Sequence, residues 1–252
     1  MRIALFSDIH ANLPALEAVL SSIDSHRPDQ VFCLGDLVGY APWPNEVVEL
    51  MRWRQVATIA GNYDEGVGLD ADDCGCAYET DEDRERGEAS IRYTNEVITD
   101  EHRRWLRQLP RHIRLQLGKE AEYSVLFVHG SPRRINEYLF EDRREESLLR
   151  ILEGADADVL AFGHTHKPYH RVVQGSGDEP REHHAINIGS VGKPKDGDPR
   201  ACWAMVEIDM EGEKPEVEVS FKRVEYDVEA AARAVEMSPL PDAFADMLRN
   251  GG

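Results

Sequence analysis

Five short apolar runs in this chain each lead directly into a polar segment, and this pattern constrains the fold more than any other feature of the sequence. The runs are Arg2–Phe6, Val31–Leu34, Val56–Ala60, Tyr123–Val128 and Val159–Phe162. Each has the length and composition of a buried strand. Helical patterns separate the first three runs, so the order is β-α-β-α-β, which predicts parallel strands joined by right-handed crossovers.

The segment after the first run has the features of a helix start. Asn12 is suited to the N-cap, and Pro14 falls in the first turn, where its missing N–H costs nothing. Apolar residues then follow on one helical face at Leu16, Val19, Leu20 and Ile23. Further helices are predicted at Asn45–Trp53, Ser90–Ile98, Thr99–Leu109, Arg143–Leu152, Val228–Met237 and Asp242–Leu248.

The second half of the chain is predicted to be rich in strands. Arg111–Leu117 pairs with Tyr123–Val128 around a turn at Gly118, and further strands are expected at Tyr169–Val173, Ala185–Ile188, Cys202–Ile208 and Val217–Phe221. So many strands suit two packed sheets better than one open sheet. No linker or repeat interrupts the chain, so residues 1–252 are predicted to form a single domain.

Residues 65–88 carry ten acidic residues against only Arg84 and Arg86. This composition predicts a solvated insertion, serving as a mobile lid or without a catalytic role. The Cys74-Gly-Cys76 motif within it is no zinc site without a second cysteine pair.

Composition excludes several classes of protein. The chain has 29 Lys and Arg against 48 Asp and Glu, a formal net charge of −19, which disfavours long nucleic-acid duplexes as partners. No apolar run approaches the roughly 20 residues needed to cross a bilayer, and the N-terminus turns polar too early for a signal peptide. Four cysteines are no disulfide framework. We therefore expect a cytoplasmic protein that does not bind membranes.

The polar residues that follow the five runs can bind metal ions. They are Asp8 and His10, Asp36, Asn62, His129, and His164 and His166. A single histidine after a strand is more often structural than a ligand, but five strand ends carrying such residues point to one site at the sheet edge. Carboxylate and imidazole ligands without thiolates suit Mn²⁺, Fe, Zn²⁺ or Ni²⁺. Seven ligands exceed what one ion takes, whereas two ions sharing a bridging carboxylate would use them fully.

The order of these motifs, D-x-H, G-D, G-N-x-[D/E], apolar-H-G and G-H-T-H, resembles the calcineurin-like metallophosphoesterase superfamily. Two further stretches, Gly35–Asn45 and Asn187–Arg200, resemble a small bacterial and archaeal phosphodiesterase-like branch of it. The resemblance implies an α/β fold, a four-layer α/β/β/α sandwich of two mixed sheets flanked by helices, with two metal ions at the shared edge of the sheets.

The resemblance also implies a ligand set. One metal ion would be held by Asp8, His10, Asp36 and His166, and the other by Asp36, Asn62, His129 and His164, with Asp36 bridging. A water between the ions would lose its proton near neutral pH and attack phosphorus, while Asn62 donates a hydrogen bond to the phosphoryl group. Asp36 and Asn62 are therefore the expected catalytic residues.

One position departs from the family pattern. Where the family often has histidine after the asparagine, this chain has Tyr63. A phenol is a poorer proton donor at neutral pH than imidazolium, so we expect a preference for leaving groups that need no protonation. The change also leaves the role of Asp64, which supports that histidine in the family, open.

Three residues are candidates for substrate contacts: Tyr40, Tyr63 and Arg133. Tyr40 is equally suited to packing its proline-rich loop, and for Arg133 an ion pair with Glu137 or Glu141 is the more common outcome. Lys193, Lys195 and Arg200 lie in a Gly/Pro-rich loop that could also reach the site.

The sequence therefore predicts an enzyme that hydrolyses small phosphate esters, of the phosphodiester or nucleotide type. Three alternatives stay open: a metal-binding interaction scaffold, a nucleotide sensor with little or no turnover, and a nuclease of the same superfamily. The oligomeric state is left open.

Overall fold

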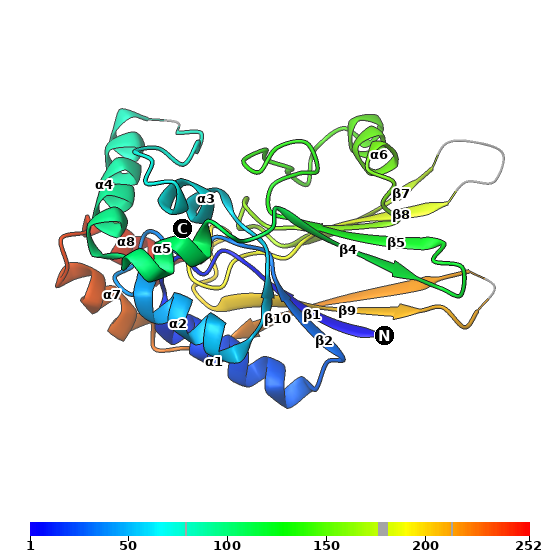
Figure 1. The fold of residues 1–252 in the computed structure, drawn as a ribbon, viewed down its shortest axis with the longest axis horizontal. Helices are drawn as coiled ribbons and strands as arrows, with labels where there is room; N and C mark the ends of the chain where they lie inside the picture. Colours follow the sequence, from blue (N-terminus) through cyan, green and yellow to red (C-terminus); the bar gives the residue numbers. More distant parts are fainter. Residues whose placement is uncertain (79, 176–180, 213) are drawn as a thin grey trace.

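The computed structural model describes residues 1–78, 80–175, 181–212 and 214–252 of the chain. Two five-stranded mixed sheets form its centre (Figure 1). The first has the order β10-β9-β1-β2-β3 and the second the order β4-β5-β6-β8-β7. The strands are β1 (Arg2–Phe6), β2 (Gln30–Cys33), β3 (Ala57–Thr58), β4 (His112–Leu117), β5 (Tyr123–Val128), β6 (Val159–Phe162), β7 (Tyr169–Gln174), β8 (Glu182–Asn187), β9 (Ala201–Asp209) and β10 (Glu216–Val224).

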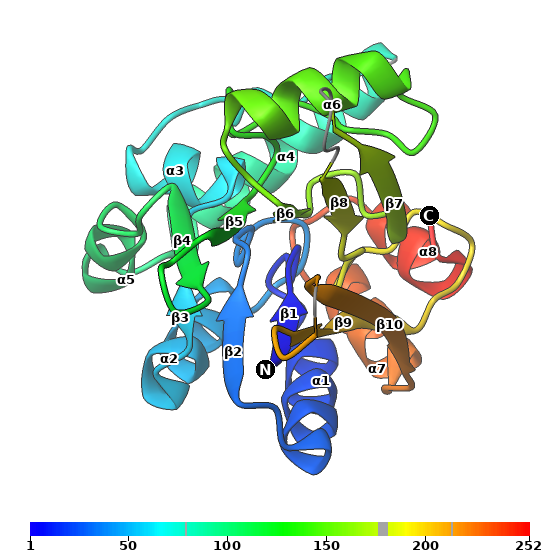
Figure 2. The ribbon, with the colours of Figure 1, turned by 90° about the vertical axis from the view of Figure 1, so that its right-hand side faces the viewer.

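Helices cover the outer faces of both sheets. Figure 2 shows the layer order, with α6 on one side of the paired sheets and α1 and α2 on the other. The helices are α1 (Leu13–His26), α2 (Pro44–Arg54), α3 (Asn62–Gly68), α4 (Asp81–Val97), α5 (Asp100–Leu106), α6 (Glu145–Gly154), α7 (Val228–Glu236) and α8 (Ala243–Asn250). The predicted four-layer α/β/β/α sandwich is confirmed.

Alternation along the strands builds these layers. In β1, Ile3 and Leu5 lie in the core between the sheets, whereas Ala4 and Phe6 face the core under α1 and α2. Successive side chains of a strand point to opposite faces, so a strand that is apolar throughout serves two cores. Between the sheets the rings of Phe32 and Phe127 meet with their centroids 4.9 Å apart.

The β1–β2 and β2–β3 pairs are parallel, as are the β5–β6 and β6–β8 pairs. The predicted crossover order is therefore confirmed for the first three strands. The carboxyl ends of these strands point toward the end of the molecule where α3, α4, α5, α7 and α8 gather (Figure 1). This placement brings loops from both sheets to one edge.

The acidic segment is more structured than its composition predicts. Residues 62–68 form α3, and α4 begins at Asp81 instead of the predicted Ser90. Thr80 caps α4 by accepting a hydrogen bond from the backbone N–H of Asp83, and acidic residues fill the first turn, where the helix dipole favours them. Three of the acidic residues of this segment, Asp81, Glu82 and Asp83, therefore stabilise a helix start. Glu79 lies outside the described residues.

Within the described part of the chain, no helix combines the length and the apolar character that crossing a membrane requires.

Candidate metal centre

Backbone geometry at the strand ends turns the predicted ligands toward one another. Asp8, His10, Asp36, His164 and His166 all adopt left-handed backbone conformations, with φ between 49° and 66°. Such conformations are uncommon for residues other than glycine and persist where the surrounding structure enforces them, often at functional sites.

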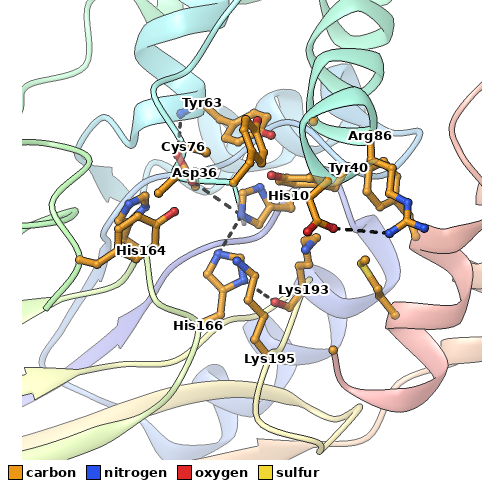
Figure 3. Close-up of a pocket in the computed structure, with 18 residues that line it drawn as sticks. His10, Asp36, Tyr40, Tyr63, Cys76, Arg86, His164, His166, Lys193 and Lys195 are labelled. Atoms are coloured by element: carbon orange, nitrogen blue, oxygen red, sulfur yellow. Dashed lines mark hydrogen bonds and ion pairs between the residues drawn. The ribbon is translucent and has the colours of Figure 1, made fainter. Parts of the chain in front are cut away.

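A first group of donors consists of Asp8, His10 and His166, all buried. The Nε2 atom of His166 lies 3.2 Å from Oδ1 of Asp8 and 3.2 Å from Nε2 of His10. Figure 3 shows the two imidazole rings facing each other across this short gap.

The tautomers of these two histidines are set by the backbone. The Nδ1 atom of His10 lies 3.1 Å from the carbonyl oxygen of Val38, and that of His166 faces the carbonyl oxygen of Lys193. Because a carbonyl only accepts, each Nδ1 carries the proton and each Nε2 presents a lone pair. Two lone pairs 3.2 Å apart repel unless a cation lies between them, so this arrangement fits a metal ion and orients its ligands as in known metal sites.

A second group consists of Asp36, His129 and His164, also buried, with Asn62 beside it. The Nδ1 atom of His129 donates to the carbonyl oxygen of Leu34 at 2.8 Å. Its Nε2 atom lies 3.0 Å from Oδ1 of Asn62 and 3.3 Å from Oδ2 of Asp36. Because Oδ1 of Asn62 and Oδ2 of Asp36 only accept, either a proton on Nε2 or a metal cation must lie among these three atoms.

Asp36 lies between the two groups. Its Oδ2 atom is 3.3 Å from Nε2 of His129 in the second group and 3.6 Å from Nε2 of His10 in the first. Its Oδ1 atom accepts a hydrogen bond from the backbone N–H of Tyr63. The carboxylate is thus oriented as a bridge between two cations would require.

Of the five buried side-chain atoms that have no hydrogen-bond partner among the described residues, two are candidate metal-binding atoms: Oδ1 of Asp8 and Nε2 of His164. Buried polar atoms are nearly always satisfied, and an unsatisfied one calls for an explanation such as a missing ion. Each belongs to a different donor group. The residues present therefore fit two divalent cations.

Electrostatics point the same way. Burial lowers the pKa of His10 and His164 to about 3, so both imidazoles are neutral and able to bind metal. At His129, burial opposes charge, but Asp36 outweighs it and raises the pKa to about 10. The second group thus attracts a positive charge, which a metal ion can supply in place of a proton.

The orientation of Asn62 differs from the sequence-based expectation. Its Nδ2 atom donates to the carbonyl oxygen of Cys74 at 3.0 Å and to Sγ of Cys76 at 3.3 Å. The amide nitrogen is therefore held by the folded-back 74–76 segment and does not face the cavity as a donor to substrate. Its Oδ1 atom is directed at the donor group, in the orientation that the predicted ligand role requires.

Two glycines permit the close approach of these loops. A Cβ atom on Gly61 would lie 2.1 Å from Oδ1 of Asp36, and one on Gly163 would lie 2.3 Å from Oδ2 of Asp8. Both carboxylates would be displaced by any side chain at these positions.

A cavity of about 310 Å³ opens onto both groups. Tyr40 and Tyr63, two of the residues proposed from the sequence for substrate contacts, line this cavity. Both rings also pack on His10, with centroid distances of 4.8 Å and 5.4 Å. Arg133 does not line this cavity. The guanidinium of Arg133 forms an ion pair with Glu137, and Arg133 lines a separate cavity beside α6.

Several lining residues were missed or left open at the sequence level. They are Cys76, Tyr78, Arg86, Tyr138, Lys193, Lys195 and Phe244. The ring of Tyr138 lies over His164 at a centroid distance of 4.1 Å. Tyr138 is close in sequence to the predicted ligand His129, and Lys193 and Lys195 are indicated by their Gly/Pro-rich loop. The other residues have no local sequence signal.

Asp64 has a supporting role that does not require histidine at position 63. Its carboxylate accepts hydrogen bonds from the backbone N–H groups of Leu37 and Gly61, each at 2.9 Å. Burial raises the pKa of this carboxyl to about 7. Asp64 thereby ties together the loops that carry Asp36 and Asn62.

Asn12 is the helix cap that the sequence predicts, since its Oδ1 atom accepts from the backbone N–H of Ala15. Its Nδ2 atom also donates to the carbonyl oxygen of Gly192 at 3.0 Å. Asn12 therefore anchors the loop around Gly192 beside the site.

A four-layer sandwich with two Asp/His donor groups at the shared sheet edge defines a class of metal-dependent phosphoesterases. The family profile described as the calcineurin-like phosphoesterase superfamily domain matches residues 1–211. The chain belongs to this family, and its two donor groups fit a dinuclear phosphoesterase.

Relatives cover the whole chain. An uncharacterized protein of Methanocaldococcus jannaschii is 33% identical, over 98% of this chain and 96% of its own length. The crystal structure of a metallophosphoesterase from Sphaerobacter thermophilus is 32% identical, with a TM-score of 0.73, and covers 100% of this chain and 99% of its own. The crystal structure of a hypothetical protein from Pyrococcus horikoshii OT3 shares the fold, with 24% identity and a TM-score of 0.81. The match covers 100% of this chain and 98% of that protein's chain.

Proposed function

We propose that this protein is a phosphodiesterase that uses two divalent transition-metal ions to hydrolyse small phosphate esters. The observation that carries the proposal is the convergence of acceptor atoms at two adjacent points, with Nε2 of His10 facing Nε2 of His166 at one and Nε2 of His129 facing Asn62 at the other. Mn²⁺, Fe, Zn²⁺ and Ni²⁺ all suit this donor set.

Asp8, His10, Asp36 and His166 would hold one ion, and Asp36, Asn62, His129 and His164 the other. When bound, the two dications neutralise charge on the phosphoryl oxygens and acidify the attacking water. The residues of the chain set the positions of both ions: Asp36 lies between the groups, and backbone carbonyls fix three of the four imidazoles.

Tyr63 supports a preference for diesters and other substrates with good leaving groups. It occupies the position from which the family's histidine assists the leaving group, and burial raises the pKa of its phenol well above the usual value. A phenol in this state gives up its proton poorly at neutral pH. Substrates whose leaving groups depart without protonation should therefore be hydrolysed faster than substrates whose leaving groups need a proton.

The test compares hydrolysis of bis(p-nitrophenyl) phosphate and p-nitrophenyl phosphate. Protein stripped with chelator should be inactive, and Mn²⁺, Ni²⁺ or Zn²⁺ should restore turnover, with the diester well above the monoester. Elemental analysis should give two ions per chain. The Asp36→Asn variant should lose turnover and bind both ions more weakly, because it loses the charge shared by the two groups.

Other outcomes would change the proposal in defined ways. Faster turnover of the monoester would overturn the preference for diesters but keep the enzyme. Activity of Asp36→Asn close to wild type would overturn the bridging role. Two bound ions with no turnover of either ester would favour a second function, that of a metal-binding scaffold or a nucleotide sensor. The observation that favours this alternative is Tyr63, which stands where the family often has histidine.

A further inference from the structure

A second cavity, of about 530 Å³, lies beside α6 on the outer side of the second sheet. It shares no lining residue with the cavity at the donor groups. Among the described residues no carboxylate lines it, whereas five arginines do: Arg111, Arg114, Arg133, Arg134 and Arg150. In a chain with a net charge of −19, this concentration of cationic side chains creates a local positive potential that attracts anions.

Three of the five guanidinium groups are already engaged. Arg111 and Arg133 each form an ion pair with a glutamate. Arg114 donates hydrogen bonds to two carbonyl oxygens at the carboxyl end of α6, each at 2.7 Å, where the helix dipole favours a positive charge. The charges of Arg134 and Arg150 are left to interact with a ligand.

Arg134 and Arg150 have no carboxylate oxygen within 4.0 Å in the part of the chain that the structure describes. On α6, Glu146 lies one turn before Arg150 but pairs with Arg144 at 3.7 Å. The backbone of Arg134 is held in a turn, since its N–H donates to Oγ of Ser131 at 3.1 Å and its carbonyl oxygen accepts from the N–H of Ser131 at 3.0 Å. The cavity therefore offers two unpaired cations, one on a helix and one on a hydrogen-bonded turn.

Apolar side chains form much of the remaining lining. Pro132, Ile135 and Ala155 are partly exposed, so each can contact a ligand, whereas Leu126 and Ile151 are buried and close the floor. The volume lies in the range of small-molecule sites, which combine apolar walls with a few charged groups. The occupant that fits is a small molecule with an apolar body and one acidic group for each unpaired arginine.

We propose that this cavity binds a small organic dianion, with one acidic group at Arg134, the other at Arg150, and the apolar body against Pro132 and Ile135. Arginine binds carboxylate and phosphate groups in the same bidentate geometry, so the shared chemistry is that of two such groups on one apolar body. The site is separate from the metal centre, and the inference does not rest on the proposed function.

The test measures binding of three sulfonates by calorimetry, because sulfonates carry a permanent charge and bind divalent ions weakly. 1,5-Naphthalenedisulfonate has two acidic groups on an apolar body, 1-naphthalenesulfonate has only one, and methanedisulfonate lacks the apolar body. We expect the first to bind about tenfold more tightly than either of the others, since a hydrogen bond to a charged group corresponds to roughly 10–100-fold in affinity.

Because His129 is among the lining residues, binding is measured on metal-loaded and on chelator-stripped protein. The affinity for 1,5-naphthalenedisulfonate should be the same in both. Loss of binding on stripping would place the probe at the metal ions and overturn the proposal. With stripped protein, displacement of the probe by terephthalate would identify carboxylate recognition, and displacement by 1,4-phenylene bis(phosphate) would identify phosphate recognition. Failure of both to displace it would also overturn the proposal.

The variants are Arg134→Gln, Arg150→Gln and the control Arg144→Gln. Each of the first two should weaken binding of 1,5-naphthalenedisulfonate about tenfold, because each removes one charged partner. Arg144 has a side chain that is 87% exposed and does not line the cavity, so the control should bind like wild type. All three arginines are exposed, and the variants should keep the wild-type melting temperature.

Equal affinity for the monosulfonate and the disulfonate would overturn the role of the two arginines. Methanedisulfonate binding as tightly as 1,5-naphthalenedisulfonate would overturn the apolar part of the site. An equal loss in Arg144→Gln and Arg150→Gln would show a general attraction to surface arginines and reject the site. None of these outcomes depends on ester hydrolysis, so failure of this inference and failure of the proposed function are distinguishable.

Discussion

At the scale of single residues, the site depends on which atom of each side chain faces inward. Three histidines are oriented by backbone carbonyls, those of Leu34, Val38 and Lys193. These partners have no side-chain signature, so the sequence indicates which histidines gather but not which nitrogen binds. The same holds for Asn62, whose amide nitrogen is taken by the 74–76 segment.

Tyr63→His should raise turnover more for poor leaving groups than for good ones. Imidazolium donates a proton near neutral pH, whereas the buried phenol does not. We expect a gain of about 100-fold for dialkyl phosphodiesters, whose leaving groups are alkoxides, and less than threefold for bis(p-nitrophenyl) phosphate; the larger gain is at the low end of the range for general acid catalysis. An equal change for both would show that position 63 is not a leaving-group donor here.

At the scale of elements, the acidic segment contributes to the metal centre through its backbone. A Cβ atom added to Gly66 would lie 2.5 Å from Sγ of Cys74. The helix α3 and the 74–76 segment therefore pack in close contact. That contact holds the Cys74 carbonyl oxygen against Nδ2 of Asn62. The segment is thus part of the ligand environment as well as a wall of the cavity.

Gly66→Ala should displace the 74–76 segment and free the amide of Asn62. We expect a several-fold weaker affinity for one of the two ions, measured by metal titration of stripped protein. Gly154→Ala at the end of α6 is the matched control, because nothing lies within 4 Å of its added Cβ atom. That control should bind metal normally and gain up to about 1 kcal/mol in stability. Equal metal binding in both variants would contradict the role of the segment.

The β7–β8 pair carries an acid-sensitive contact far from the donor groups. Nε2 of His170 lies 3.0 Å from Nδ1 of His184, and burial lowers the pKa of His184 to about 4. The unfolded chain therefore binds a proton between pH 6.5 and pH 4 that the folded chain does not. Stability from this group is present above pH 6.5 and is lost as the pH falls toward 4.

His184→Gln should accordingly lose less stability on acidification than wild type. Urea unfolding of metal-free protein at pH 7 and pH 5 should show the difference, on the order of 1 kcal/mol. Val172→Ala, a change at a half-exposed position on β7, should shift the midpoint equally at both pH values. If His184→Gln does the same, the pair does not couple stability to pH.

At the scale of the whole molecule, the metal centre exists only where the two sheets meet. Asp8, His10 and Asp36 follow strands of the first sheet, whereas His129, His164 and His166 follow strands of the second. Packing between the sheets therefore sets the distances within both donor groups. The apolar core that holds them together includes Phe32, Phe127 and Ile186.

Phe127→Ala should destabilise the fold by about 3–5 kcal/mol, since it removes a fully buried ring from this core. The substitution should also weaken metal binding, because His129 directly follows β5, two residues after Phe127. Phe140→Ala, at a position 47% exposed, should change the free energy of unfolding by less than about 1 kcal/mol. A loss of stability without any loss of metal affinity would show that the two sheets hold the site independently of this ring.

Much of this architecture is encoded locally. Apolar runs that end in Asp, Asn or His specify both strands and ligands, since the carboxyl ends of parallel strands meet at one edge. The helix at Leu13–His26 follows from Asn12, Pro14 and an apolar face. The sequence pattern predicts the start of α4 too late, at Ser90, because acidic residues in a capped first turn have the same composition as a solvated segment.

The sequence by itself determined the fold class, the family and the seven residues that gather at the sheet edge, because periodicity and motif order are properties of neighbouring residues. Only the tertiary structure decided which nitrogen of each histidine faces inward, how Asn62 is turned, that Arg133 pairs with Glu137 away from the cavity, and that Lys193 and Lys195 line it without carboxylate partners in the described chain. These outcomes depend on contacts between segments far apart in the sequence, and no local pattern records such contacts.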